Sequence, residues 1–397
     1  MFRTVLFWMH LVAGVAAGAV ILLMSVTGVL LTYEKQMLEW ADRRQAQVVP
    51  PSVEARALPP EALLAAAIAA QPGAAPTGLA RRADPGAPAT VTFEGGRAQL
   101  VHPYRGVTVG EPSPGLRAFF RATTNWHRWL ALEGASRPTG RLVTGAANLV
   151  FLFIVLSGLY LWLPRLLTRV QFTRVLWFRG GLSAKARDFN WHNVIGFWSA
   201  VPLAIVVAGA VPISFPWASN LVYRMVGDSP PPRPPQEARA GGASGAGAAG
   251  GSPDRATPPV VELSGLDAAW AAAQAQAPAW RSMSVRLGGA RSAPFVIIID
   301  DGYGGQPQWR RTFTVDRGSG AVVKAERFDD LGPGRRVRSW LRFAHTGEYY
   351  GLSGQTIAGL VSAGAAVLVY TGIALALRRL WAWWRRRAPR SEDSRAA

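Results

Sequence analysis

The chain contains five histidines, and four of them lie at the edges of long apolar segments. His127 stands in the phrase "NWHRWL" and His192 in the similar phrase "NWHNVIGFW", while His10 and His345 occupy comparable places in "WMHLVAG" and "RFAHTGEYYG". Imidazole binds metal ions and exchanges protons near neutral pH. An ionisable side chain at the border of an apolar segment is costly, so these four residues are the first candidates for chemistry.

Four apolar runs are long enough to cross a membrane as helices, which takes about 20 residues each. The first run follows Arg3 and contains Ala17-Gly18-Ala19, which imitates a signal-peptide cleavage site. Cleavage there falls in the middle of the run, so the run is predicted to remain as a helix. The sequence therefore predicts a four-span membrane protein, with spans in Val5–Leu31, Leu142–Leu163, Val194–Phe215 and Thr356–Leu377.

The basic residues predict the orientation of these spans. The segment between the second and third runs and the tail after Leu377 are rich in arginine, so the positive-inside rule places both in the cytoplasm. Both termini are then cytoplasmic, and two long loops, about 34–141 and 216–355, lie on the outer side. The net charge of +19 reflects this topology first, and attraction to anionic lipid or an anionic ligand second. Nucleic-acid binding is not favoured.

The absence of cysteine narrows the possible chemistry. It excludes disulfides, thiol catalysis, thiolate iron–sulfur clusters and covalently attached c-type haem. Any redox centre must therefore be held noncovalently by other ligands.

The two outer loops share one pattern. In each, a helical segment ("LPPEALLAAAIAAQ" or "SGLDAAWAAAQAQAP") precedes short strands separated by tight turns. Each loop is predicted to form a small α+β unit, with one helix on an antiparallel sheet. The Pro-, Gly- and Ala-rich stretch between the third span and the second unit has the composition of a disordered linker.

The duplication extends into the membrane. Each half reads histidine, span, outer unit, histidine, span, which indicates two parallel repeats related by a pseudo-two-fold axis along the membrane normal. The predicted organisation is a first span (1–33), a first outer unit (34–118), a histidine-bearing segment with the second span (119–163), a cytoplasmic loop (164–190), a third span (191–216), the linker (217–262), a second outer unit (263–337), a histidine-bearing segment with the fourth span (338–379) and a basic cytoplasmic tail (380–397).

This topology sorts the four histidines into pairs. His10 and His192 fall at the cytoplasmic ends of their spans, and His127 and His345 fall just before their spans on the outer side. His102 lies in a predicted strand as an ordinary residue of the first unit. Two facing imidazoles can be the axial ligands of a b-type haem in a helical bundle. Zinc or copper would need further ligands, so metal transport is the weaker alternative. The sequence thus predicts two b-type haems, one at each membrane face.

Other residues have expected roles around these haems. Five tryptophans would supply flat apolar surface, although tryptophan also belongs in interfacial belts whatever the function: Trp8, Trp126, Trp129, Trp191 and Trp198. The positive side chains expected to receive haem propionates are Arg128, Arg342, Lys185 and Arg187.

The chain resembles the PepSY-associated transmembrane family. The resemblance rests on "FWMHLVAGVAAGAVILLMSVTGVLLTYE", the "NWHRWL" and "NWHNVIGFW" phrases, "RFAHTGEYYG" before a span, and the two PepSY-like outer units. The order of these motifs is specific, whereas any one alone is weak. The family includes iron-regulated inner-membrane proteins and ferric-siderophore reductases that bind two b-type haems, so the resemblance implies His10 with His192, and His127 with His345, as axial pairs.

The resemblance also implies a mainly α protein of the bacterial inner membrane, with both PepSY-like units in the periplasm, that acts as a ferric-chelate reductase. Electrons would come from a quinol or a cytoplasmic reductase, the acceptor would be a ferric siderophore or similar iron chelate, and no protein nucleophile or acid–base pair would be needed. The alternative is a PepSY-type binding or regulatory protein acting on a periplasmic peptidase or sensor without redox activity. The residues expected to contact an anionic chelate are Arg117, Arg121, Arg342, Tyr349 and Tyr350.

Overall fold

The protein falls into two units, which are described separately. The bundle unit comprises Met1–Thr32, Ala122–Ser219 and Leu341–Ala397, and the sheet unit comprises Tyr33–Arg121 and Asn220–Trp340. The structure is a computed structural model that describes residues 1–163, 173, 175–232, 262–287 and 293–387. Much of the predicted linker (217–262), part of the predicted cytoplasmic loop (164–190) and the end of the predicted tail (380–397) lie outside the described residues.

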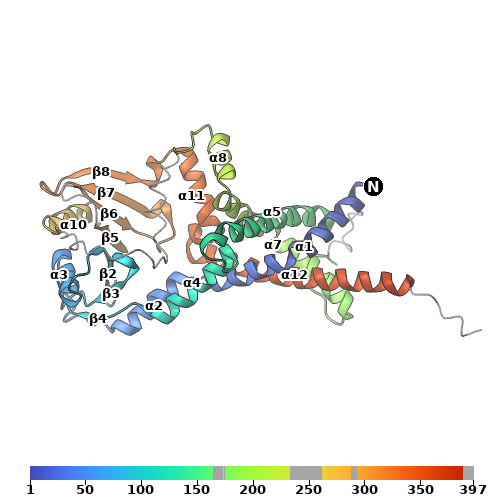
Figure 1. Ribbon diagram of the computed structural model, residues 1–397, viewed down its shortest axis with the longest axis horizontal. Helices are drawn as coiled ribbons and strands as arrows, with labels where there is room; N and C mark the ends of the chain where they lie inside the picture. Colours follow the sequence, from blue (N-terminus) through green and yellow to red (C-terminus); the bar gives the residue numbers. More distant parts are fainter. Residues whose placement is uncertain (164–172, 174, 233–261, 288–292, 388–397) are drawn as a thin grey trace, which may run out of the picture. The chain divides into compact units, whose positions relative to one another are not determined.

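Four long helices form the bundle unit (Figure 1). Each is long and apolar enough to cross a membrane, which agrees with the four apolar runs of the sequence. α1 and α7 each pack against both α5 and α12, so the four helices form a closed ring in which α1 and α7 lie on one diagonal. The helices are α1 (Phe2–Leu31), α5 (Arg137–Trp162), α7 (Ala184–Ser214) and α12 (Gly351–Arg387).

The centre of the bundle is apolar apart from a few internally bonded groups. Leu203 and Val207 of α7 pack against Val361 and Ala365 of α12. Asn148 of α5 is buried and donates its Nδ2–H to the carbonyl oxygen of Val207 at 2.9 Å. An amide in such a place needs an internal acceptor, because no water is available to replace one.

Short helices adjoin the long ones. α4 (Pro114–Trp129) precedes α5, α11 (Pro333–His345) precedes α12, and α8 (Pro216–Met225) follows α7. The prediction had assigned residues 217 onward to the linker, so α8 corrects its first part; α2 (Glu34–Ala46) was likewise not foreseen. Both were missed because they lie outside the apolar runs.

The sheet unit holds one antiparallel sheet of eight strands in the order β4-β3-β2-β1-β5-β6-β7-β8 (Figure 1). β1 pairs with β5 in a register that sets Leu79 opposite Val285. The sequence predicted two small sheets and did not foresee this pairing, which joins them into one. The strands are β1 (Pro76–Arg82), β2 (Ala89–Phe93), β3 (Ala98–Val101), β4 (Thr108–Gly110), β5 (Ser282–Arg286), β6 (Phe295–Asp300), β7 (Arg310–Val315) and β8 (Val322–Arg327).

One apolar core joins the sheet to two helices, α3 (Pro60–Ala70) and α10 (Leu266–Ala275). Phe295, Ile297 and Ile299 alternate along β6 and are all buried, as expected where successive side chains of a strand point to opposite faces. They belong to the same core as Leu63 of α3 and Trp270 of α10. Each half of the sheet therefore contributes one helix and at least three strands to a shared interior.

The first turns of α3 and α10 cap each other. The backbone N–H of Glu61 donates to Oδ1 of Asp267 at 2.9 Å, and the N–H of Asp267 donates to Oε1 of Glu61 at 3.1 Å. Each carboxylate thus satisfies a free N–H group of the other helix and lies at the positive end of that helix. The arrangement also places two acids close together.

We expect Asp267→Asn to stabilise the α3–α10 contact at pH 7. Burial, and then the Glu61 carboxylate, raise the pKa of Asp267 against the opposing effect of the Glu61 N–H bond. A raised pKa means that the stability from Asp267 is full below its unfolded pKa of about 3.9 and is lost as the pH rises through the folded value. Asparagine keeps the acceptor without the charge, so hydrogen exchange of α3 and α10 should slow.

Two further variants make this test decisive. Asp267→Ala removes the acceptor and should accelerate exchange in both helices, by a loss of roughly 1 kcal/mol. Asp316→Asn is the matched control, and it should lower stability at pH 7 rather than raise it. Asp316 accepts hydrogen bonds from Ser319 and Gly318 that lower its pKa, so its negative charge is favoured in the folded protein. Faster hydrogen exchange in Asp267→Asn than in the wild type would contradict the prediction that the charge of Asp267 destabilises the α3–α10 contact.

Candidate functional site

The bundle unit brings the four repeated histidines to its two ends. His10 lies in the third turn of α1 and His192 in the third turn of α7. His127 and His345 lie in the last turns of α4 and α11, just before the chain enters α5 and α12. All four side chains are half-buried. The ends are called the His10 end and the His127 end below.

A strained turn sets the position of His127. Leu130 and Ala131 have φ values of 53° and 55°, which are unusual for residues with a side chain. A Cβ at Gly140 would lie 2.1 Å from the carbonyl oxygen of Trp129, so α5 passes directly against the end of α4. This close approach, available only to glycine, fixes His127 over the bundle.

His127 and His345 face each other. Their ring centroids are 6.3 Å apart and their planes are inclined by 44°. An imidazole nitrogen binds a transition metal at about 2.0–2.1 Å, so two opposed imidazoles sharing one metal ion have centroids roughly 6 Å apart. The spacing of this pair suits a shared metal centre.

His10 and His192 form the other group. They lie on α1 and α7, which are diagonal in the ring of helices. His10 contacts α5 at Gly158, and His192 contacts α12 at Gly372. Each diagonal helix thus presents its histidine to a different neighbour.

Every one of these histidines is held through its Nδ1 atom by another helix. For three of them the partner is a hydroxyl oxygen 2.9 Å away: Ser157 for His10, Thr27 for His127 and Thr371 for His192. For His345 the partner is the carbonyl oxygen of Val206, at 2.7 Å. The four rings therefore share one mode of attachment.

The partners determine where the proton lies on each ring. A carbonyl oxygen only accepts, so His345 must donate its Nδ1–H to Val206. The hydroxyls of Thr27 and Thr371 each donate to the carbonyl four residues earlier, at 2.7 and 2.8 Å, and that of Ser157 to the carbonyl three residues earlier, at 3.2 Å. Their oxygens are then left to accept the imidazole proton. All four rings are inferred to be Nδ1–H tautomers, with the Nε2 lone pair available as a ligand.

A glycine follows each hydroxyl residue and makes room for the ring. A Cβ at Gly158 would lie 3.2 Å from Cε1 of His10, and one at Gly372 would lie 3.3 Å from Cε1 of His192. At Gly28 the corresponding distance to His127 is 3.7 Å. Each hydroxyl-glycine dipeptide thus combines a hydrogen-bond acceptor with a backbone that leaves room for the imidazole ring. The three dipeptides are Ser157-Gly158, Thr27-Gly28 and Thr371-Gly372.

The fourth position departs from this pattern. Ala208 precedes Gly209 on α7, so no hydroxyl is present there. A Cβ at Gly209 would lie 3.1 Å from Cβ of His345 and 2.4 Å from the carbonyl oxygen of Leu341. α11 therefore packs so closely on α7 that His345 reaches the backbone carbonyl of Val206 instead.

A buried carboxylate ties the helices together at the His10 end. Asp188, only 1% exposed, lies one turn before His192 and accepts hydrogen bonds from Arg378 of α12 at 2.6 Å and from Arg187 at 2.9 Å. Arg187 also stacks over Trp191. Arg187 was expected to meet a propionate, but in this structure its charge is already paired.

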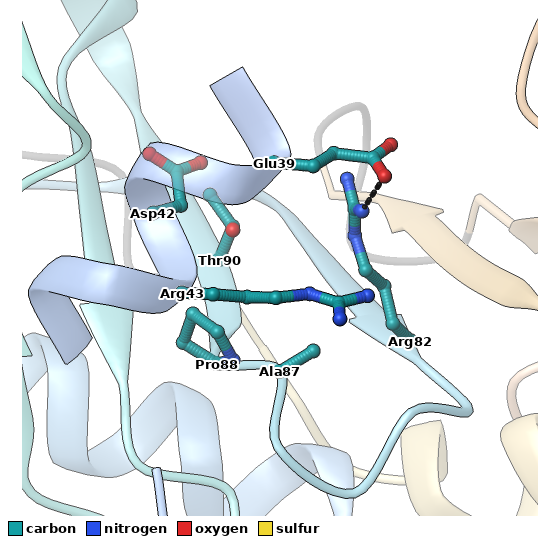
Figure 2. A pocket seen from close by; sticks show the side chains of 7 residues that line it. All are labelled: Glu39, Asp42, Arg43, Arg82, Ala87, Pro88 and Thr90. Atoms are coloured by element: carbon teal, nitrogen blue, oxygen red, sulfur yellow. Dashed lines mark ion pairs between the residues drawn. The ribbon is translucent and has the colours of Figure 1, made fainter. Parts of the chain in front are cut away.

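The residues predicted to contact a chelate are divided between the two units. In the sheet unit, Arg117 donates to Oδ2 of Asp42 at 2.8 Å, so it is already paired. Asp42 lines a small charged pocket in which Arg82 and Glu39 form an ion pair of 2.5 Å (Figure 2). Arg121 lies in the same unit, one residue before the bundle unit begins.

The remaining predicted contacts lie in the bundle unit, near the His127 end. Arg342 is in the last turn of α11, with its guanidinium over the ring of Phe343. Tyr349 and Tyr350 stack edge to face with centroids 5.2 Å apart. Arg342 lies one turn before His345 and is the predicted contact most directly associated with the histidine pair.

His102 and three of the expected tryptophans do not join the histidine site, whereas Trp129 and Trp191 carry arginines beside His127 and His192. His102 is buried in the sheet unit, where Nδ1 accepts the backbone N–H of Tyr104. Trp8, Trp126 and Trp198 are between 47% and 58% exposed. Their placement suits an interfacial belt rather than the expected lining of a cofactor.

Sequence reasoning missed several of the residues that hold the histidines. Ser157, Thr27 and Thr371 lie within apolar runs and were not singled out, although the repeated hydroxyl-glycine dipeptide was a readable signal. The Asp188–Arg378 contact carried no such signal, because its partners are 190 residues apart. Within the described residues, no group of three or more acidic or histidine side chains is placed to hold a metal ion, which gives no support to a zinc or copper site.

Comparison with known proteins gives a family match. The family model described as the PepSY-associated TM region matches residues 7–379, nearly the whole chain. No curated protein matches the sequence.

We expect Asp188→Ala to destabilise the bundle at the His10 end. Removal of the carboxylate leaves Arg378 without its charged partner, at a cost of roughly 2–3 kcal/mol, because the arginine retains some access to solvent. Thermal unfolding of the detergent-solubilised protein would measure the loss. Asp84→Ala is the control, since Asp84 forms a more exposed pair with Arg43; an equal effect of the two variants would contradict the assignment.

Proposed function

The chain belongs to the family of the PepSY-associated TM region, and from that premise we propose that it is a di-haem inner-membrane reductase for periplasmic ferric chelates. The proposed electron source is a quinol or a cytoplasmic reductase, and the proposed acceptor is a ferric siderophore or similar iron chelate. The observation that carries the proposal is that the Nδ1 atoms of both histidine groups all lie within hydrogen-bond distance of a neighbouring helix, which would leave each Nε2 atom as the ligand.

The histidine groups fit b-type haem better than a bare metal ion. Two imidazoles give a metal ion only two protein ligands, and no acidic or further histidine side chain among the described residues completes the set. A porphyrin supplies the four equatorial nitrogens itself, so two axial imidazoles are enough. When bound, haem supplies reversible one-electron chemistry at its iron.

The protein's contribution is to fix the axial ligands. Ser157 and Thr371 would orient His10 and His192 for one haem, and Thr27 and the Val206 carbonyl would orient His127 and His345 for the other. A hydrogen bond to Nδ1–H holds the ring orientation and raises the basicity of the ligating nitrogen. His10 and Thr27 are 17 residues apart on α1, about 25 Å along the helix axis, so the two haems would lie at opposite membrane faces.

The distribution of basic residues supports the proposed orientation. The described arginines of α12 beyond the apolar run, including Arg378, Arg379 and Arg385, lie at the His10 end. The positive-inside rule makes that end cytoplasmic and places both termini there. The sheet unit would then be periplasmic and correspond to two PepSY-like modules. Its sequence of one helix and four strands, repeated once, is consistent with an origin by duplication.

We expect the histidine variants to separate the two haems. The wild-type protein should carry two haems per chain, and replacement of His10 or His192 by alanine should remove one of them. Replacement of His127 or His345 should remove the other. Haem quantitation by the pyridine haemochrome assay, with reduced-minus-oxidised spectra, would measure the loss.

Double variants and a control sharpen this test. Replacing both histidines of one pair should lower the haem content no further than replacing one of them. Replacing one histidine from each pair should remove all haem. His102→Ala should retain both haems, because His102 is bonded within the sheet unit. A colourless wild-type protein after haem-supplemented expression would refute the reductase and favour the PepSY-type regulatory alternative.

We also expect Thr371→Val to weaken haem binding at the His10 end and to raise the midpoint potential of that haem. Valine removes the acceptor for Nδ1–H of His192, so the ligand becomes less basic and stabilises ferric iron less; such losses typically cost about 10- to 100-fold in metal affinity. Haem titration and optical redox titration would measure both effects. Thr356→Val is the control on the same helix, because the Thr356 hydroxyl donates to Leu352; an equal shift there would contradict the role of Thr371.

A further inference from the structure

Four arginines gather at the His127 end of the bundle unit. Arg128 directly follows His127 and Arg342 lies one turn before His345. Arg137 and Arg141 lie on the first two turns of α5, four residues apart and so on the same face of that helix. The cluster therefore draws on three helices around the paired imidazoles.

The packing of α4 against α5 brings Arg128 and Arg137 together. The hydroxyl of Thr144 donates to the carbonyl oxygen of Arg128 at 3.0 Å, which ties the end of α4 to α5. Both guanidinium groups lie over the ring of Trp129, at 4.5 Å for Arg128 and 3.7 Å for Arg137. The shared ring holds two positive charges near each other.

Neutral groups hold the other two arginines. Arg141 donates from Nε to the carbonyl of Ser214 at 3.1 Å and from a terminal nitrogen to that of Ile213 at 2.9 Å, at the end of α7. The guanidinium of Arg342 lies over the ring of Phe343 at 5.6 Å. Carbonyls and aromatic rings orient a guanidinium without cancelling its charge.

Among the ion pairs of the described residues, none includes these four arginines. Burial, and then Arg141, Arg342 and Arg137, lower the pKa of Arg128. The carboxylate of Glu348 accepts a hydrogen bond from Thr346. The positive end of the α5 helix dipole adds to the same field.

We propose that Arg128, Arg137, Arg141 and Arg342 form a binding site for carboxylate groups beside the His127–His345 pair. Guanidinium presents paired N–H donors that match a carboxylate, and weak hydration lets it bind one at a partly buried site. Arg128, Arg141 and Arg342 are exposed enough for a ligand to reach them. The carboxylate has two possible sources, a haem propionate or a carboxylate-bearing iron chelate, and the identity of the source rests on the proposed function.

The test measures binding of ferric citrate and of citrate alone by calorimetry, on the full-length protein in neutral detergent. Arg137→Gln and Arg342→Gln remove one guanidinium each and should weaken binding by about 10-fold or more. Arg137→Lys, which keeps the charge, should retain part of the affinity and show that the fold is intact. Arg385→Gln is the matched control, because Arg385 also stacks over a tryptophan, at 3.7 Å from Trp381, at the other end of α12.

The outcomes separate the two sources. Weaker ferric citrate binding with unchanged haem content assigns the site to the chelate. Loss of one haem in the glutamine variants, with no citrate binding to the wild type, assigns it to a propionate. Glutamine variants that match the wild type in both measurements overturn the site, and so does inorganic phosphate binding as tightly as citrate, because the preference for carboxylates is then absent.

The same measurements keep this site distinct from the proposed reductase. A protein without haem that binds citrate through these arginines retains the site and refutes the reductase. If the protein binds two haems, and neither citrate binding nor haem content changes when the arginines are replaced, only the carboxylate site is refuted.

Discussion

The central constraint on the bundle is that each imidazole placed among apolar helices needs an acceptor for its ring proton. His10, His127 and His192 find a hydroxyl on a neighbouring helix, and His345 finds a backbone carbonyl. Each bond orders a ring, fixes its tautomer and joins two helices at once. An unsatisfied donor there would cost about 1–3 kcal/mol, so helix packing and ligand chemistry depend on the same contacts.

The local chain geometry follows from this requirement. A ring can reach a hydroxyl on the facing helix only if the backbones approach closely, and a glycine follows each hydroxyl where the ring lies. On α7, where alanine replaces the hydroxyl residue, a closer crossing of α11 at Gly209 brings His345 to a carbonyl. Two different local sequences thus produce the same protonation state. The strained turn at Leu130 and Ala131 helps to set the position of His127. Backbone strain of this kind persists only where the surrounding contacts hold it.

Charge is organised differently at the two ends of the bundle. At the His10 end, buried Asp188 compensates Arg187 and Arg378, so the charges mainly stabilise the packing of α7 on α12. At the His127 end, the arginines are oriented by carbonyls and aromatic rings, which leave their charge available to an anion. The first arrangement suits a structural contact and the second a binding site. In the sheet unit, the first turns of α3 and α10 are capped internally by Asp267 and Glu61.

The sequence by itself determined the four apolar helices, the family, and the set of histidines that belong together, because span length, motif order and residue spacing are local properties. It also indicated the helix and strands of each outer unit. Only the tertiary structure revealed the β1–β5 pairing that makes one sheet, the hydroxyl partners of the imidazoles and the Asp188–Arg378 contact. These depend on register and on residues that lie 100 or more positions apart in the sequence. No local pattern encodes which face of one helix meets another, so the atoms that set the chemistry of each histidine emerged only from packing.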